Sequence, residues 1–242
     1  GAATAAGRLA SSTPEGAAAP SRAPAPAGRS LARVRGPQYS PDVRPHVSRG
    51  GKALTDDGPL TRRWTEQRWL LDNTIRAVGM DWDQPRSIYL SVPCGPEANA
   101  DFAAIRQRIT KLADASPAFE AVARRREARA QAAEVNRDLV TARENYFMAS
   151  VHWGAAQWPI DTNKEQNRAY NAKKRECYSK YATLADHLVE AAWIPIPGGA
   201  KLPAWFHLPP GYRGGRIPVV ISLPGMDSFK EIGVAMYGDR WL

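Results

Sequence analysis

Residues 217–231 read IPVVISLPGMDSFKE and carry the main signal for the fold. The first seven of them, 217–223, form a nearly continuous apolar run, which is typical of a strand buried on both faces of a sheet. A glycine turn follows at Gly225. Ser228 and Glu231 then match the S-x-x-E capping box that opens a helix. The pattern predicts a central strand, a turn and a helix in that order.

Such a turn has a chemical use because it leaves backbone N–H groups unpaired at the carboxyl end of the strand. Donors of this kind stabilise the negatively charged oxygen that forms when a carbonyl is attacked, and removal of one lowers the rate by roughly 10²–10³. Such donors are expected at the turn that contains Gly225. Many α/β proteins contain a strand, a glycine and a helix, so this pattern alone leaves the reaction open.

Two short extended runs precede this segment. Residues 192–196 and 202–208 are apolar and aromatic, and Pro197-Gly198-Gly199 separates them, which predicts a hairpin. We assign residues 191–242 to the start of an α/β domain.

Upstream, residues 57–190 carry apolar residues at spacings of three and four, which predicts four or five amphipathic helices. The expected helices cover about 61–78, the region of Phe102 to Leu112, a stretch that begins at Ser116-Pro117, 139–157, and a last one after Asp161 to Asn163. In the third, arginines 124, 125, 126 and 129 alternate with glutamates, and we interpret them as a solvated face.

Aromatic residues gather in the last two expected helices. They are candidate walls of a substrate pocket, although aromatic residues at helical spacing also form ordinary cores: Tyr146, Trp153, Trp158 and Tyr170. His152 and His187 have no second ligand at i±4, so no metal site is expected, and nothing in the sequence calls for a cofactor.

The first 52 residues are rich in alanine, proline and glycine and poor in large apolar residues, which predicts a disordered arm. Seven arginines and Lys52 against Glu15 and Asp42 place +6 of the net charge of +9 there. The arm contains one aromatic residue, Tyr39, and no stacking pattern of the type that single-strand binders use, so we interpret it as a solvated tail and do not expect nucleic acid as a partner.

Composition excludes several further classes. No apolar run approaches 18 residues and no signal peptide is recognisable, so we expect a cytoplasmic protein with no membrane partner. The two cysteines, Cys94 and Cys177, match neither a disulfide framework nor a zinc module.

Residues 205–242 resemble the start of an α/β-hydrolase domain, in particular that of the 2,6-dihydroxypseudooxynicotine hydrolase-like esterases, which place a helical domain ahead of the hydrolase core. The oxyanion turn of that family reads roughly G-G-x-[DE]-S-x-K-E. Pro224 here replaces the first glycine, and the matching positions are Gly225, Asp227, Ser228, Lys230 and Glu231. The resemblance implies that the Met226 N–H is an oxyanion donor and that 57–190 is a cap-like domain.

The resemblance also implies an incomplete α/β-hydrolase fold, with the first strands only. No G-x-S-x-G occurs in the 242 residues, so we expect the catalytic triad beyond Leu242 and expect this fragment to be inactive. His207 precedes the oxyanion turn and therefore does not match the catalytic histidine. The intact protein is expected to be a carboxylesterase or C–C bond hydrolase that acts on a small-molecule ester or ketone without a cofactor or metal; a homodimer stays open.

Two further expectations follow from the residues. The alternative function is a non-catalytic helical binding protein with a basic arm. Because the parallel strands that should flank 217–223 are mostly absent, we also expect residues 193–242 to be poorly ordered or aggregation-prone, with that run open to water.

Overall fold

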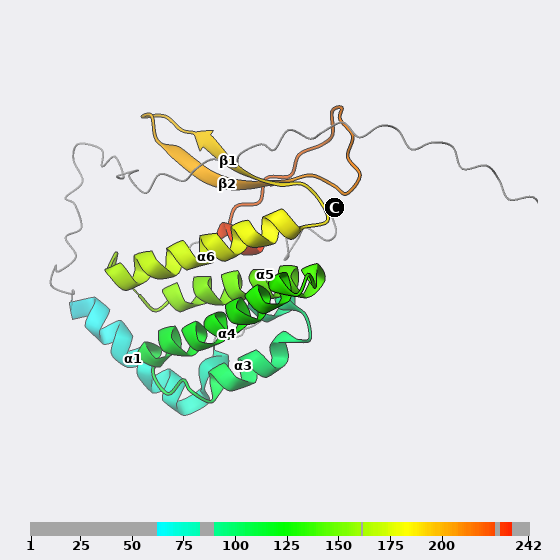
Figure 1. Ribbon diagram of the computed structural model, residues 1–242. Helices are drawn as coiled ribbons and strands as arrows, with labels where there is room; N and C mark the ends of the chain where they lie inside the picture. Colours follow the sequence, from blue (N-terminus) through cyan, green and yellow to red (C-terminus); the bar gives the residue numbers. More distant parts are fainter. Residues whose placement is uncertain (1–61, 83–89, 161, 226–227, 234–242) are drawn as a thin grey trace, which may run out of the picture. The chain divides into compact units, whose positions relative to one another are not determined.

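The computed structural model describes residues 62–82, 90–160, 162–225 and 228–233, apart from the side chains of 62–65 (Figure 1). These residues all belong to one unit, 39–242. The arm predicted for residues 1–52 lies outside the described residues. Within the described part, the helices lack the combination of length and apolar character that crossing a membrane requires.

The described helices confirm the predicted helical block. They are α1 (Arg62–Val78), α3 (Ala98–Arg106), α4 (Ala115–Val135), α5 (Leu139–Gln157) and α6 (Glu165–Leu184). Short 3₁₀ turns lie at η1 (Met80–Trp82), η2 (Val92–Cys94), η3 (Leu112–Asp114) and η4 (Lys230–Ile232). The predicted second helix is shorter than expected, because α3 ends at Arg106 and Leu112 belongs to η3.

Helix α5 lies at the centre of the block and packs against both α4 and α6 (Figure 1). It is buried on nearly all sides from Asn145 to Ala156. The small residues Ala149, Gly154 and Ala155 allow close approach of its neighbours, and a helix that is apolar all round belongs in the interior.

Local signals at the helix ends are only partly those predicted. Gly79 ends α1 with φ +76°, and its N–H donates to the Ile75 carbonyl at 2.7 Å. The predicted cap of α6 at Asp161 to Asn163 is wrong in position, because Lys164 is the N-cap and makes no side-chain cap hydrogen bond. Of the stripe predicted for α1, Ile75 is buried but Val78 is exposed, and the side chain of Trp64 lies outside the described residues.

The predicted hairpin is confirmed. Strands β1 (Val189–Pro195) and β2 (Lys201–His207) pair antiparallel, with Val189 opposite His207 and Pro195 opposite Lys201. Gly198 and Gly199 have φ of +92° and +83°, a conformation that glycine adopts without steric cost and that the tight turn requires.

The hairpin is joined to α6 through polar and aromatic contacts. His187 lies between Asp186 and His207, with Nδ1 3.0 Å from Asp186 Oδ1 and Nε2 2.9 Å from His207 Nδ1. His207 Nε2 is 3.2 Å from the Tyr178 hydroxyl, and the Tyr178 and Trp205 ring centroids are 4.7 Å apart. These contacts fix the base of β2 on α6.

The run 217–223 is not a central strand in this structure. Within the described residues no strand pairs with it, and Val219, Ile221 and Leu223 are 68%, 78% and 83% exposed. The prediction of burial on both faces is therefore wrong for this chain, because no flanking parallel strand is present among the described residues. The expected opening of the run to water is observed.

Candidate functional site

The turn at Gly225 is closed by a backbone hydrogen bond from the Ser228 N–H to the Gly225 carbonyl, at 3.0 Å. Gly225 itself is exposed, and no described atom lies within 4 Å of the place where a Cβ would stand. Met226, the second candidate oxyanion residue, lies outside the described residues, as does Asp227. What can be described is how the C-terminal side of this turn is held.

Glu231 does not form the predicted capping box. The N-cap of η4 is Phe229, which makes no side-chain cap hydrogen bond, and the Glu231 side chain is fully buried. Its Oε1 accepts a hydrogen bond from Trp205 Nε1 at 3.3 Å and pairs with Lys230, while Oε2 lies 3.8 Å from Lys174 Nζ. The capping prediction is wrong because partners from α6 and β2 outcompete the local backbone.

The electrostatics of this buried group favour an ionised carboxylate. Burial by itself raises the pKa of Glu231, but Lys174 and Lys230 outweigh it and hold the pKa below its ordinary value. Burial lowers the pKa of the Lys174 ammonium, and Glu231 opposes that shift. Lys174 and Glu231 therefore depend on each other for their charges.

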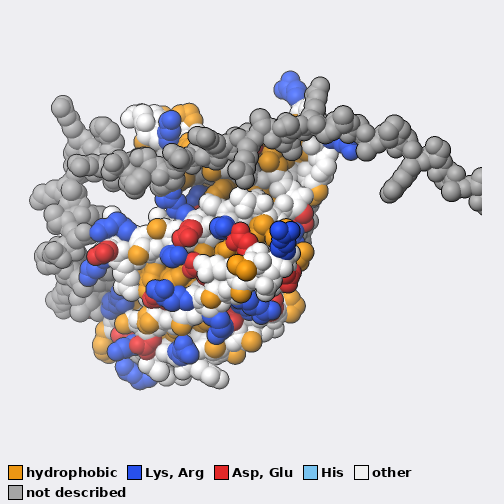
Figure 2. Space-filling view, viewed as in Figure 1, with side chains coloured by type: hydrophobic (Ala, Val, Ile, Leu, Met, Phe, Trp, Pro, Cys, Tyr) orange, Lys and Arg blue, Asp and Glu red, His pale blue; other side chains and the backbone are white. Residues whose placement is uncertain are grey.

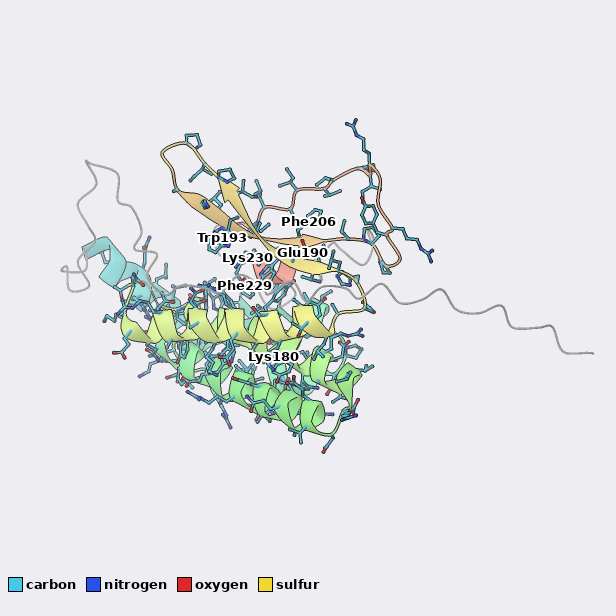
Figure 3. All side chains as sticks on the ribbon, turned by 45° about the horizontal axis from the view of Figure 1, so that its top comes forward. Lys180, Glu190, Trp193, Phe206, Phe229 and Lys230 are labelled. Carbon is cyan, nitrogen blue, oxygen red and sulfur yellow. The ribbon has the colours of Figure 1, made fainter. Side chains whose placement is uncertain are left out.

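Phe229 is held by a second contact, with α5. A Cβ added to Gly154 would come closer than 3 Å to Cζ, Cε1 and Cε2 of the Phe229 ring, so only glycine leaves room for the ring in this position. The Lys174 ammonium lies 5.1 Å from the centre of the same ring. Figure 3 shows Phe229 and Lys230 near the hairpin, consistent with the contacts of η4 with β2 and α5.

Together these residues form a single anchor that ties the Gly225 turn to both the helical block and the hairpin. We call it the turn anchor, and it consists of Gly154, Lys174, Trp205, Phe229 and Glu231. Sequence reasoning assigned Glu231 to a cap and gave no role to Gly154 or Phe229. The signal available in the sequence was a glycine inside the last turn of a helix, next to Ala155 and Ala156, since a glycine within a helix often has a packing reason.

Two of the four predicted pocket aromatics lie together in the interior. Trp153 and Tyr170 are buried with ring centroids 5.5 Å apart. Trp153 Nε1 donates to Glu127 Oε2 at 3.2 Å, and the Tyr170 hydroxyl donates to Glu120. Trp158 packs, partly buried, against the same core at the C-cap of α5.

Tyr146 lines a hollow of about 350 Å³ between α4 and α6, next to Lys180, which is labelled in Figure 3. Its hydroxyl donates to Glu134 at 2.6 Å, and Lys180 pairs with the same carboxylate at 3.0 Å. These bonds hold the pKa of Glu134 below its ordinary value, the bond from Tyr146 having the larger effect. The charges of the hollow are therefore largely paired, as Lys173 also pairs with Glu127.

The arginine-rich part of α4 is not entirely a solvated face. Arg126 is only 5% exposed, and it donates to Asp101 at 2.6 Å, to Glu97 at 2.8 Å and to Asn145 at 2.9 Å. This network joins α4 to α5, α3 and the residue that precedes α3. The neighbouring arginines 124, 125 and 129 are exposed as predicted, and Figure 2 shows basic and acidic side chains intermingled on the face in view.

The described residues hold no group of three or more histidine, cysteine, aspartate or glutamate side chains placed to bind a metal ion. His152 is fully buried in the helical block, and His187 is engaged with Asp186 and His207.

No protein-family model matches the chain. Among curated proteins it is 33% identical over 101 residues to "Alpha/beta hydrolase xenA" of Xenoacremonium sinensis, a match that covers 41% of this chain and 24% of that protein. It is 32% identical over 146 residues to "Hydrolase ORFZ" of Pyricularia oryzae, which covers 54% of this chain and 34% of that protein. The chain thus spans about a quarter to a third of the length of these relatives.

Among solved structures, the 2,6-dihydroxy-pseudo-oxynicotine hydrolase superposes with a TM-score of 0.50 over 64% of this chain and 41% of that one, at 23% sequence identity. This likeness shows a shared fold. It confirms the expected fold class, an incomplete α/β-hydrolase fold preceded by a helical domain. In sequence the chain is therefore similar to proteins named as hydrolases or α/β hydrolases, and in fold it is similar to one solved hydrolase.

Proposed function

We propose that this chain supplies the helical cap and the oxyanion turn of a hydrolase that cleaves an ester, or a carbon–carbon bond next to a carbonyl, in a small molecule. The reaction proceeds through a nucleophile and an acyl-enzyme. The observation that carries the proposal is the anchored Gly225 turn: in a chain with hydrolase relatives, the turn whose sequence resembles their oxyanion loop is tied to α5, α6 and β2.

Met226 and Gly225 have different roles in the proposed oxyanion turn. The Met226 backbone N–H donates to the oxygen on which negative charge develops, and Gly225 leaves space for the substrate to approach the backbone. An oxyanion donor is effective only when it is fixed before the reaction, because reorganisation at that moment costs free energy. The turn anchor supports this role, since it holds Phe229 and Glu231, on the C-terminal side of the turn.

The helical block contributes the other wall of the substrate site. Tyr146, Trp153, Trp158 and Tyr170 belong to α5, its C-cap and α6 and are the aromatic residues proposed to shape it. No G-x-S-x-G is present in the 242 residues, so the proposal assigns the nucleophile, the acid and the base to residues outside this sequence. By the same reasoning the 242 residues alone have no hydrolase activity.

The proposal is tested in the complete protein with Met226→Pro, which removes the backbone N–H, and with Met226→Ala, which keeps it. On p-nitrophenyl esters we expect the proline variant to lose roughly 10²–10³ in kcat and the alanine variant to stay within about threefold of the parent. Equal rates for both variants would remove the oxyanion role from this turn.

A serine-directed phosphonate tests the nucleophile separately. We expect it to inactivate the complete protein with one equivalent bound, because an activated serine attacks the phosphorus as it attacks a carbonyl. Activity that is indifferent to the phosphonate would contradict serine catalysis.

A further inference from the structure

We propose that Gly154 and Glu231 are positioning residues for the oxyanion turn: Gly154 admits the Phe229 ring to the surface of α5, and Glu231 ties η4 to Lys174 and Trp205, so that the turn keeps one position. The proposal rests on the proposed function, because the turn must supply an oxyanion donor for its position to affect the rate. Neither residue touches the reacting atoms.

Gly154 acts through a steric contact with Phe229. Gly154 lies in the last turn of α5, and alanine has a higher helix propensity than glycine. The Phe229 ring occupies the volume that an alanine Cβ would need, with Cζ and both Cε atoms closer than 3 Å to that point. Glycine at this position therefore lowers the helix propensity of α5 but makes room for the contact with Phe229.

Glu231 acts through its charge and its hydrogen bond to Trp205. Glu231 is a fully buried carboxylate whose Oε2 has no hydrogen-bond partner within the described residues, although Lys174 Nζ lies 3.8 Å away. Desolvation makes such a pair a weak source of stability, and well-packed apolar residues often replace it without loss. It does fix geometry, since the carboxylate is held by groups from α6 and β2 and by its neighbour Lys230.

Ser228 connects the turn anchor to the Gly225 turn. Phe229 follows directly after Ser228, whose N–H closes the turn on the Gly225 carbonyl. A displacement of the ring is therefore passed to the turn through a single residue. A misplacement of about 1 Å caused by a remote mutation can cost about 10² in rate.

The experiment uses the complete protein and the variant Gly154→Ala. We expect kcat to fall by about 10- to 100-fold, with KM within about twofold of the parent value, since substrate binding does not need the oxyanion donor and the transition state does. Far-UV circular dichroism and the melting temperature are measured alongside. A parent-like kcat, or a loss that merely follows a lowered melting temperature, would overturn the proposal.

The matched controls are Phe229→Leu and the double variant Gly154→Ala/Phe229→Leu. Leucine lacks the Cε and Cζ atoms that the new methyl group would meet. We expect the double variant to recover at least fivefold in kcat over Gly154→Ala, with Phe229→Leu alone being less active than the parent. If Gly154→Ala does not fold, the double variant still answers the question: active protein that contains the alanine supports the steric contact, and failure of both to fold overturns the positioning role.

Glu231→Gln tests the electrostatic part, because the amide oxygen can still accept from Trp205 Nε1 while the charge that faces Lys174 is lost. We expect kcat to fall about tenfold with KM little changed, and we expect Lys174→Met/Glu231→Gln, which removes both charges, to restore the folded yield but not kcat. Recovery of kcat in the double variant would show that the pair serves only to balance a buried charge.

Failure of this proposal differs from failure of the proposed function. In a Met226→Pro background the donor is already absent, so Gly154→Ala should lower kcat no further. If Met226→Pro has no effect, the proposed oxyanion role fails. If Met226→Pro lowers kcat and Gly154→Ala does not, only the positioning role fails.

Discussion

His152 lies fully buried inside the helical block, with its ring centroid 5.5 Å from that of Phe102 and 6.1 Å from that of Phe119. Neither ring nitrogen has a hydrogen-bond partner among the described residues, and Nε2 is 3.8 Å from Asp101 Oδ2. Burial lowers the pKa of His152 to about 4, although Asp101 opposes the shift. The imidazole is therefore neutral at neutral pH.

This depressed pKa makes stability depend on pH. An unfolded histidine has a pKa of about 6.5, so between pH 6.5 and 4 the unfolded state binds more protons than the folded one. The contribution of His152 is fully present above pH 6.5 and is lost as the pH falls toward 4, by up to about 3 kcal/mol. His207, whose pKa burial also lowers to about 4, acts in the same direction.

Urea unfolding at a series of pH values measures this effect. The slope of the unfolding free energy against pH reports how many more protons the unfolded state binds than the folded state. Between pH 6.5 and 4 we expect His152→Phe to lower this number by about one and to leave the contribution of His207 in place. An unchanged slope would mean that His152 is charged, or exposed to water, in the folded chain.

Arg126 illustrates what a residue-by-residue reading of the sequence misses. Its neighbours 124, 125 and 129 are solvated as their charge predicts, but Arg126 lies on the stripe of α4 that also carries Phe119, Val122 and Ala130. The periodicity of that stripe could have placed it inside. What the sequence could not provide was the partners that make burial tolerable, Asp101 and Asn145, because they come from other helices.

At the scale of elements, local periodicity predicts most of the helices and the hairpin, although α3 ends earlier than its apolar spacing indicates. The helices follow the spacing of three and four, and the hairpin follows from two apolar runs around Gly198 and Gly199, since both signals are contained within one segment. Two predictions whose outcome depends on distant partners are wrong. Residues 217–223 read as a buried strand but have no partner among the described residues, and Glu231 reads as a cap but contacts α6 and β2.

The unpaired state of 217–223 gives a measurable prediction for the 242-residue chain. We expect the amides of Val219, Val220 and Ile221 to exchange with solvent deuterium at nearly the rate of an unfolded peptide, because no strand bonds to them among the described residues. The amides of Ile196 and Leu208 are the internal reference, since they donate to Ala200 at 2.9 Å and to Leu188 at 3.0 Å. Protection of the first set in a monomer would contradict the structure.

At the scale of the whole molecule, net charge and large apolar residues are unevenly distributed along the chain. The first 52 residues carry +6 of the net charge of +9, and the sequence assigns them no core. We expect a chain that begins at residue 53 to keep its helical circular dichroism and to melt within about 2 °C of the 242-residue chain, because too few apolar residues are removed to change the buried area. A marked loss of helix would show that the arm belongs to the fold.

The same pair of chains tests the alternative function. A binding protein with a basic arm would hold DNA with an affinity that falls steeply with salt and disappears with the first 52 residues. We expect neither chain to bind DNA at physiological ionic strength.

The resemblance to α/β hydrolases was accessible from the sequence, but the organisation of the candidate site was not. The turn at Gly225 and the helical block can each be recognised from their own residues. The contact of Gly154 with Phe229 joins segments that are far apart in the chain, and no local pattern specifies which face of α5 meets the turn. The physical reason is that a tertiary contact depends on the shapes of both packed elements, which a local sequence pattern does not specify.

The contacts from Asp186 through His187 and His207 to Tyr178 have a directional consequence. A proton on His187 Nδ1 donates to the Asp186 carboxylate; where His187 Nε2 carries no proton, it accepts from His207 Nδ1, and His207 Nε2 then accepts from the Tyr178 hydroxyl. One carboxylate at the surface thereby selects the tautomer of two imidazoles and the orientation of a phenol in the interior. Replacement of the Asp186 carboxylate would allow donor and acceptor to exchange in the hydrogen bonds from His187 to His207 and from His207 to Tyr178, with no movement of the heavy atoms.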